Sequence, residues 1–199
     1  MREFDHRPTR RAALAGLAAA PFLATAARAQ VSPPKLGDDG LYHFDWFLES
    51  FLDFREDLDA AHGKGKRLVI LWSQKGCVYC KKMATEYFVD PKIVGYVREK
   101  FDVLHLDMYG ARECVDFDGA KFSEKSIGLR YQVRTTPTLL FFPETSAGLE
   151  KKSELDREIG RMPGLLPKPQ FLAMFTFVGE KGYEKGSFAD WVKSQGLSL

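Results

Sequence analysis

The hydrophobic pattern after residue 40 predicts an amphipathic helix. Large apolar side chains recur there at the three- and four-residue spacing that places them on one helical face. These residues are Phe44, Phe47, Leu48, Phe51, Phe54 and Leu58. Gly63 and Gly65 predict the end of the helix, because glycine is common just past a helix C-terminus. We expect the stripe to pack into the core, and residues 30–40, rich in proline and glycine, to form an exposed leader.

Nearly continuous apolar runs further along the chain predict buried strands. The runs are Arg67–Ser73, Phe101–Asp107 and 138–142, and a further strand is predicted over residues 157–162. Helical patterns separate or follow them at residues 80–88, from Asp90-Pro91 onward, and at 123–131, 169–178 and about 188–192. This alternation predicts an α/β fold, with a central mixed sheet flanked by helices, an N-terminal helical extension and a C-terminal helix.

Length and charge narrow the classes of protein. The chain has 199 residues, of which 45% are hydrophobic and 28% charged, as expected for one globular domain. Its net charge of +2 comes from an arginine-rich start, and residues 30–199 carry a net charge of −1. Nucleic acid is therefore excluded as a partner, because binding phosphates requires an excess of basic residues on the folded part.

The first 29 residues have the three-part layout of a secretory signal peptide. A basic region precedes an uncharged stretch rich in alanine and leucine, and the small-residue pattern Ala27-Arg28-Ala29 follows. The uncharged stretch is shorter than the roughly 20 apolar residues that span a bilayer. Thr9-Arg10-Arg11 resembles a twin-arginine export signal. We predict cleavage before Gln30, a single domain over residues 30–199, and a location in the periplasm.

Two of the three cysteines, Cys77 and Cys80, carry the predicted chemistry. Spaced by three at a helix start, they face the same side and lie close enough for a disulfide. Cys77 should be the attacking thiol, since the helix dipole and nearby lysines, Lys75 and Lys81 among them, stabilise its thiolate. Cys80 should resolve the mixed disulfide. No cofactor beyond this redox-active pair is expected, and no metal, because zinc requires four ligands and there is no second such pair.

The order of strand, cysteine pair, helix, strand, helix and then Thr135-Thr136-Pro137-Thr138 entering a strand resembles the thioredoxin fold over almost the whole chain after residue 30. The resemblance implies that Pro137 is cis and lies against the cysteines. A proline has no backbone N–H, so we expect the backbone of Thr136 to pair with an extended client beside Cys77.

Longer segments resemble the SoxW proteins, exported thioredoxin-like members of the bacterial sulfur-oxidising system. They are Phe47-Leu-Glu-Ser-Phe51, Leu71-Trp-Ser-Gln-Lys-Gly-Cys-Val-Tyr-Cys-Lys-Lys-Met83, Leu106-Asp-Met-Tyr-Gly110, Asp116-Phe-Asp-Gly119, Met162-Pro-Gly and Phe171-Leu-Ala-Met174. The resemblance implies a dithiol-disulfide shuttle that takes electrons from a CcdA/DsbD-like membrane protein and reduces disulfide-bearing clients, including sulfur-oxidation proteins. We expect client contacts from Trp72 and Tyr79 in addition to Thr136 and Pro137.

Two features depart from plain thioredoxins. Leu71 stands where those proteins have a buried aspartate that relays protons, so Cys80 must exchange its proton through water, Glu86 or another group. The loop over residues 108–122 is long and contains Cys114, for which a partly buried free thiol, an intermolecular disulfide and a third redox role all stay open. We read Asp116-Phe-Asp-Gly119 as a turn, because the remaining ligands of a calcium loop are missing.

Two other functions are also consistent with the sequence. One is a periplasmic disulfide oxidase or isomerase, since reduction potentials vary widely among proteins with such cysteine pairs. The other is a non-catalytic protein that uses the fold to bind a metal or a partner.

Overall fold

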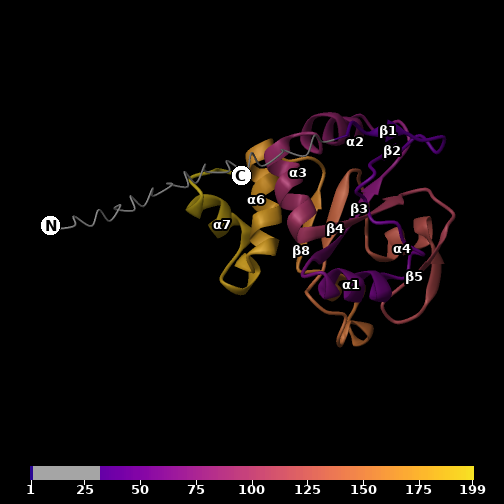
Figure 1. Ribbon diagram of the computed structural model, residues 1–199. Coiled ribbons are helices and arrows are strands. Elements are labelled where there is room, and N and C mark those ends of the chain that lie inside the picture. Colours follow the sequence, from indigo (N-terminus) through magenta and orange to yellow (C-terminus); the bar gives the residue numbers. More distant parts are fainter. Residues whose placement is uncertain (2–31) are drawn as a thin grey trace. The chain divides into compact units, whose positions relative to one another are not determined.

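The computed structural model describes Met1 and residues 32–199 (Figure 1). Apart from Met1, the predicted signal peptide lies outside the described residues. Residues 32–199 belong to one compact unit, to which the following description applies. No helix in the described part is long and apolar enough to cross a membrane.

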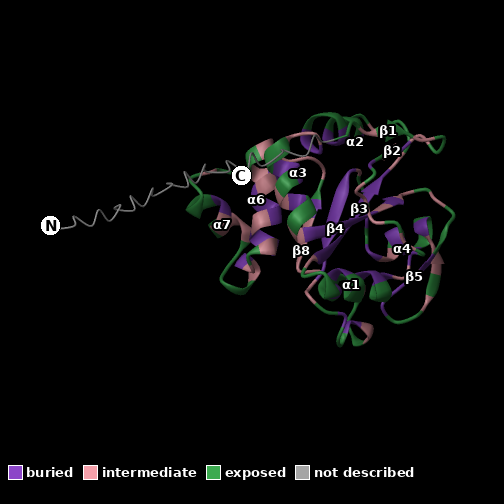
Figure 2. Cartoon of the chain, viewed as in Figure 1, coloured by how far each residue is buried: buried purple, intermediate pink, exposed green. Residues whose placement is uncertain are grey.

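A four-stranded mixed sheet, in the order β4-β3-β7-β8, lies at the centre of this unit. Its strands are β3 (Arg67–Ser73), β4 (Phe101–Asp107), β7 (Thr138–Phe141) and β8 (Gly160–Pro163). The β3 strand pairs in parallel with β4, whereas β7 is antiparallel to both of its neighbours. All residues of β3 are buried (Figure 2), which agrees with its continuous apolar sequence.

Helices cover both faces of the sheet. Side chains alternate between the two faces along each strand, so a strand of continuous apolar residues makes both faces apolar, and both must be covered. Val69 and Leu71 of β3 contribute to one core with α3 and α6, while Ile70 and Trp72 contribute to the other with α1 and α4. The helices are α1 (Phe54–Gly63), α2 (Val78–Lys82) with its π-helical continuation η1 (Met83–Tyr87), α3 (Pro91–Lys100), α4 (Glu124–Arg130) and α6 (Lys168–Gly179). The predicted fold class is confirmed.

Four further short helical elements follow β7 in the chain. They are η2 (Leu149–Lys151), α5 (Glu154–Arg157), η3 (Gly182–Glu184) and α7 (Phe188–Ser194). The C-terminal helix α7 begins with a reciprocal capping box between Ser187 and Asp190, which satisfies backbone N–H groups at its start. The predicted C-terminal helix is therefore confirmed.

The prediction of one helix from residue 44 to residue 58 is wrong in its first half. Leu52 has a φ of 65°, which is incompatible with a continuous helix, and the side chain of Asp53 then accepts hydrogen bonds from the N–H groups of Arg55 and Glu56. The helix α1 therefore begins at Phe54. The aromatic residues before α1 do not continue the helix. Together with Phe88, which follows η1, they form an irregular aromatic cluster of Phe44, Trp46, Phe47 and Phe88.

A small hairpin precedes this cluster where a leader was predicted. Its strands, β1 (Lys35–Leu36) and β2 (Tyr42–His43), are antiparallel. The backbone of Leu48 then donates a hydrogen bond of 2.8 Å to Val103 of β4. We call residues 35–48 the N-terminal extension. It is largely exposed at the hairpin, yet Leu41 and Phe44 are buried.

Two other boundaries differ from the predictions. The loop over residues 108–122 contains a second hairpin, made of β5 (Glu113–Val115) and β6 (Lys121–Ser123), which was not predicted because its strands are short and mostly polar. The last strand of the sheet begins at Gly160 instead of residue 157, because residues 154–157 form the helical turn α5 and the Arg157 side chain is held by buried polar groups.

Burial gives Asp57 of α1 an unusual ionisation. Desolvation, supplemented by nearby carboxylates, raises the pKa of Asp57 to about 6, although Ser50 Oγ donates a hydrogen bond of 2.6 Å to its Oδ2. A carboxyl whose pKa is higher in the folded than in the unfolded chain binds more protons when folded. The stability of the protein should therefore fall as the pH rises from about 4 to about 6.

Replacing Asp57 by asparagine should remove this pH dependence while retaining an acceptor for Ser50. We expect the free energy of unfolding of Asp57→Asn, relative to the parent, to shift in favour of the variant by about 1 to 3 kcal/mol between pH 4 and pH 8. Urea unfolding at both pH values measures the shift. A difference between variant and parent that is independent of pH would contradict the assignment.

Candidate functional site

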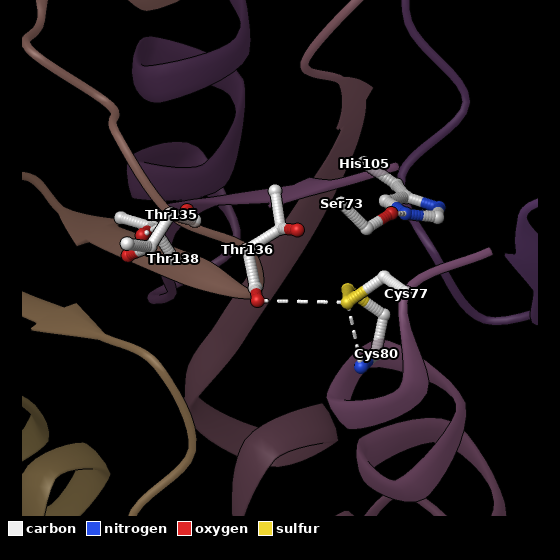
Figure 3. The surroundings of a disulfide bond; sticks show 7 residues. All are labelled: Ser73, Cys77, Cys80, His105, Thr135, Thr136 and Thr138. Carbon is white, nitrogen blue, oxygen red and sulfur yellow. Dashed lines mark hydrogen bonds between the residues drawn. A yellow bond between two sulfur atoms is a disulfide. The ribbon is translucent and has the colours of Figure 1, made fainter. Parts of the chain in front are cut away.

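Cys77 and Cys80 form a disulfide where β3 leads into α2. Gly76, with a φ of 74°, allows the chain to turn immediately before Cys77, and Cys77 is the N-cap residue of α2. The backbone N–H of Cys80 points at Cys77 Sγ at 3.0 Å (Figure 3). In the reduced protein the same N–H stabilises a thiolate at Cys77.

The two cysteines differ in accessibility. Cys77 is partly exposed at the start of α2, whereas Cys80, three residues further along in the first turn, is only 6% exposed. A client sulfur can therefore reach Cys77 before it can reach Cys80. This difference supports the predicted order of attack, with Cys77 first and Cys80 resolving.

The Thr136-Pro137 peptide bond is cis, as predicted, and the loop that contains it lies against the disulfide. The carbonyl oxygen of Thr136 is 3.5 Å from Cys77 Sγ (Figure 3). Pro137 is buried and its carbonyl accepts a hydrogen bond from Gly164, whereas Thr136 is partly exposed. Segments 59 residues apart in sequence thus meet at one sulfur atom.

The other residues predicted for the site divide into two groups. Lys75, Lys81 and Tyr79 are exposed beside the cysteines, and Tyr79 is 62% exposed. Trp72 corrects the prediction, because it is fully buried in the core on the α1 and α4 side and cannot touch a client. Glu86 is exposed on η1 and is not among the residues that line the cavity at the disulfide. Its part in proton exchange with Cys80 stays a prediction.

A pair of polar residues near the disulfide was missed by the sequence analysis. The side chains of Ser73, the last residue of β3, and His105 of β4 are hydrogen-bonded to one another (Figure 3). Burial lowers the pKa of His105 to about 3, with a smaller effect from neighbouring His43, so the imidazole is neutral near pH 7. The only sequence signal was a histidine within a mostly apolar strand, and the pairing itself depends on the register between β3 and β4.

A cavity of about 340 Å³ adjoins Cys77 and Cys80 on the side of Ser73 and His105. Its lining is mostly apolar and is shared between the N-terminal extension and the segment from β3 to η1. Lys75 and Lys81 also line it, and none of its described lining residues is acidic. No residue of the Thr136-Pro137 loop contributes to it.

Cys114 lies apart from this site, in β5. Its side chain is fully buried, and burial together with nearby carboxylates raises the pKa of the thiol to about 12. The thiol is thus protonated near neutral pH. A buried free thiol was one of the open alternatives, and the structure favours it over a role in disulfide exchange.

We expect Cys114 to resist alkylation in the native protein. After mild reduction at pH 8, iodoacetamide should label Cys77 first and leave Cys114 unmodified, because only a thiolate that is accessible reacts rapidly. Adding denaturant should expose the third thiol. Mass analysis of proteolytic fragments distinguishes the three positions, and rapid native labelling of Cys114 would contradict its burial.

Comparisons with known proteins agree with this arrangement. A family model described as a thioredoxin-like domain matches residues 54–179. A thioredoxin-fold protein from Helicobacter pylori superposes with a TM-score of 0.58 at 19% identity, covering 76% of this chain and 92% of that one. A thioredoxin from Thermus thermophilus gives a TM-score of 0.51 at 24% identity, with coverages of 68% and 90%. No curated protein matches the chain. The structural likenesses concern the fold alone.

Proposed function

Because the chain belongs to the thioredoxin-like domain family and carries a disulfide between Cys77 and Cys80, we propose that it is a thiol-disulfide oxidoreductase that reduces client proteins in the periplasm. The observation that carries the proposal is the unequal exposure of the two cysteines beside the Thr136 carbonyl. One sulfur is placed to meet a client and the other to release it.

The first exchange begins with the reduced protein. The Cys77 thiolate attacks one sulfur of the client disulfide, so that a bond forms between Cys77 and the client and the other client sulfur leaves as a thiolate. Thr136 lies beside the new bond and offers its backbone carbonyl to an extended client segment. Such a contact resembles the pairing of a strand at the edge of a sheet. It binds the client through its backbone and therefore tolerates varied client side chains.

The second exchange releases the client. Cys80 loses its proton to the client thiolate that left first, and its sulfur then attacks Cys77 Sγ. The bond between Cys77 and the client breaks, and the second client thiolate takes a proton from solvent. The client has gained two electrons, and the protein now holds the Cys77–Cys80 disulfide that the structure contains.

A further turnover requires two electrons from outside the protein. We propose that a membrane dithiol protein of the CcdA/DsbD type supplies them, and that sulfur-oxidation proteins are among the clients. Support for both comes from the resemblance to SoxW proteins, and support for the periplasm from the signal-peptide pattern of residues 1–29. Mass analysis of the mature protein tests export, with an N-terminus at Gln30 expected.

The reduction potential of the Cys77–Cys80 pair tests the direction of electron flow. The protein is equilibrated with thiol-disulfide buffers of known potential and then alkylated. Mass analysis gives the fraction of reduced protein at each buffer potential. We expect a value near the potential of about −270 mV that is typical of reducing thioredoxins. A value near about −120 mV, typical of a strong periplasmic oxidant, would overturn the reductase assignment and favour disulfide formation.

A further inference from the structure

Part of the cavity beside the disulfide is built from residues that precede the thioredoxin-like domain. The family match begins at residue 54, whereas one wall of the cavity belongs to the N-terminal extension. The residues that the extension contributes to the lining are Leu36, Gly40, Leu41, Tyr42, Phe44 and Phe47. The extension therefore completes a cavity that the domain forms only in part.

Several contacts hold the extension in place, so the cavity exists before a client arrives. Gly40 packs so closely on the stem of Lys75 that an added Cβ would lie 2.6 Å from Lys75 Cγ. Asp39 bonds to the ring of His43 at 2.9 Å and to the N–H of Leu41 at 3.0 Å, which fixes the hairpin turn. A preformed pocket costs less ordering on binding than one that must be assembled.

The cavity and the Thr136 carbonyl adjoin different sides of Cys77. In Figure 3, Thr136 lies on one side of the Cys77 sulfur, and Ser73 with His105, which line the cavity, lies on another. A client held covalently at Cys77 would thus have its backbone near Thr136. The client side chain next to its cysteine could then reach into the cavity. The mouth is positively charged through Lys75 and Lys81, with no acidic residue among its described lining.

We propose that this cavity is a side-chain pocket that selects client cysteines flanked by a large apolar residue, with an acidic group close by. The inference rests on the proposed function, since the occupant is the client of the Cys77 exchange. Apolar walls match an aromatic or branched aliphatic side chain, and the lysines at the mouth match a carboxylate. A volume of about 340 Å³ accommodates such a side chain.

Symmetric peptide disulfides test the proposal. The peptides are identical except for the residue next to cysteine, which is phenylalanine, leucine, serine or lysine, and each carries one nearby glutamate or glutamine. Their reduction by the fully reduced protein is followed by acid quenching and mass analysis. We expect kcat/KM to be roughly 10- to 100-fold higher for the phenylalanine than for the serine peptide, the range expected when one apolar side chain becomes buried. Glutamate should increase the rate relative to glutamine at low salt.

Two exposed leucines provide a matched pair of variants. Leu36 lines the cavity and is 62% exposed, whereas Leu129 of α4 is 64% exposed and does not line it. We expect Leu36→Ser to lower the ratio between phenylalanine and serine peptides at least threefold, and Leu129→Ser to leave it unchanged. Tyr42→Ala, which removes a ring from the cavity wall, should lower the ratio further.

The possible outcomes separate this inference from the proposed function. Equal rates for all four flanking residues would overturn the pocket while leaving the reductase intact, as expected if another part of this chain fills the cavity. A preference for phenylalanine that survives both Leu36→Ser and Tyr42→Ala would also overturn it, because the selectivity would then arise elsewhere. Failure to reduce any peptide would overturn both proposals.

Discussion

Replacing Cys77 by serine should abolish reduction of a protein disulfide such as that of insulin, with a residual rate indistinguishable from the uncatalysed reaction. The physical reason is that the serine hydroxyl is not ionised near neutral pH and forms no disulfide, and Cys80 is too buried to replace Cys77. The rate of insulin precipitation in the presence of a reductant measures the loss. Activity of Cys77→Ser above background would show that another thiol makes the first attack.

The matching substitution at Cys80 has a different expected result. Cys80→Ser keeps the attacking thiol but cannot resolve the mixed disulfide, so client proteins should remain attached to Cys77 through a bond that dithiothreitol cleaves. Non-reducing electrophoresis detects such adducts. Cys114→Ser is the control, and because the thiol is buried away from the disulfide it should retain nearly full activity and trap nothing.

Removing the buried charge of Arg157 should have the largest effect on stability. Its Nη1 lies 2.7 Å from Asp116 Oδ2, and both side chains are almost completely buried. The carbonyl of Leu149 accepts a further hydrogen bond from Nε at 2.9 Å, and Tyr131 donates its hydroxyl proton to Asp116 Oδ1 at 2.7 Å. This cluster joins the turn at Asp116 to α5 and to the end of α4.

We expect Arg157→Met to lower the free energy of unfolding by about 3 to 5 kcal/mol, because Asp116 would be left as an unpaired buried charge. Urea unfolding at pH 7 measures the loss. Arg98→Met, at an exposed position of α3, should change stability by no more than about 0.5 kcal/mol. Combining Arg157→Met with Asp116→Leu should recover much of the loss, whereas strictly additive losses would contradict the importance of the pairing.

The sequence predicted the sheet best where the apolar pattern was continuous. The bounds of β3 and β4 agree with the predicted runs, since a strand buried on both faces admits few polar residues along its length. The pairing of Cys77 with Cys80 could be predicted equally well, because its geometry follows from the local spacing of residues along a helix. The turn at Asp116-Phe-Asp-Gly119 belongs to the same class, with Gly119 at a φ of 80°.

The aromatic residues from Phe44 to Phe54 illustrate where local pattern failed. Their spacing fits a helix, yet Phe51 is 96% exposed and Leu52 adopts a positive φ. Phe44 and Phe47 instead pack their rings against Phe88. These contacts join segments that are far apart in the sequence. Spacing alone cannot reveal such a competition.

Local order along the chain was thus sufficient to identify the cysteine pair, the buried strands and most helices, because each depends on residues within a few positions of one another. Contacts between distant segments decided the rest of the site. The register of the strands and the packing of the rings decide three features of the site. They are the face of β3 from which Trp72 projects, the pairing of Ser73 with His105, and the apolar cavity between the extension and the disulfide. These arise only when the whole chain minimises its exposed apolar surface at once.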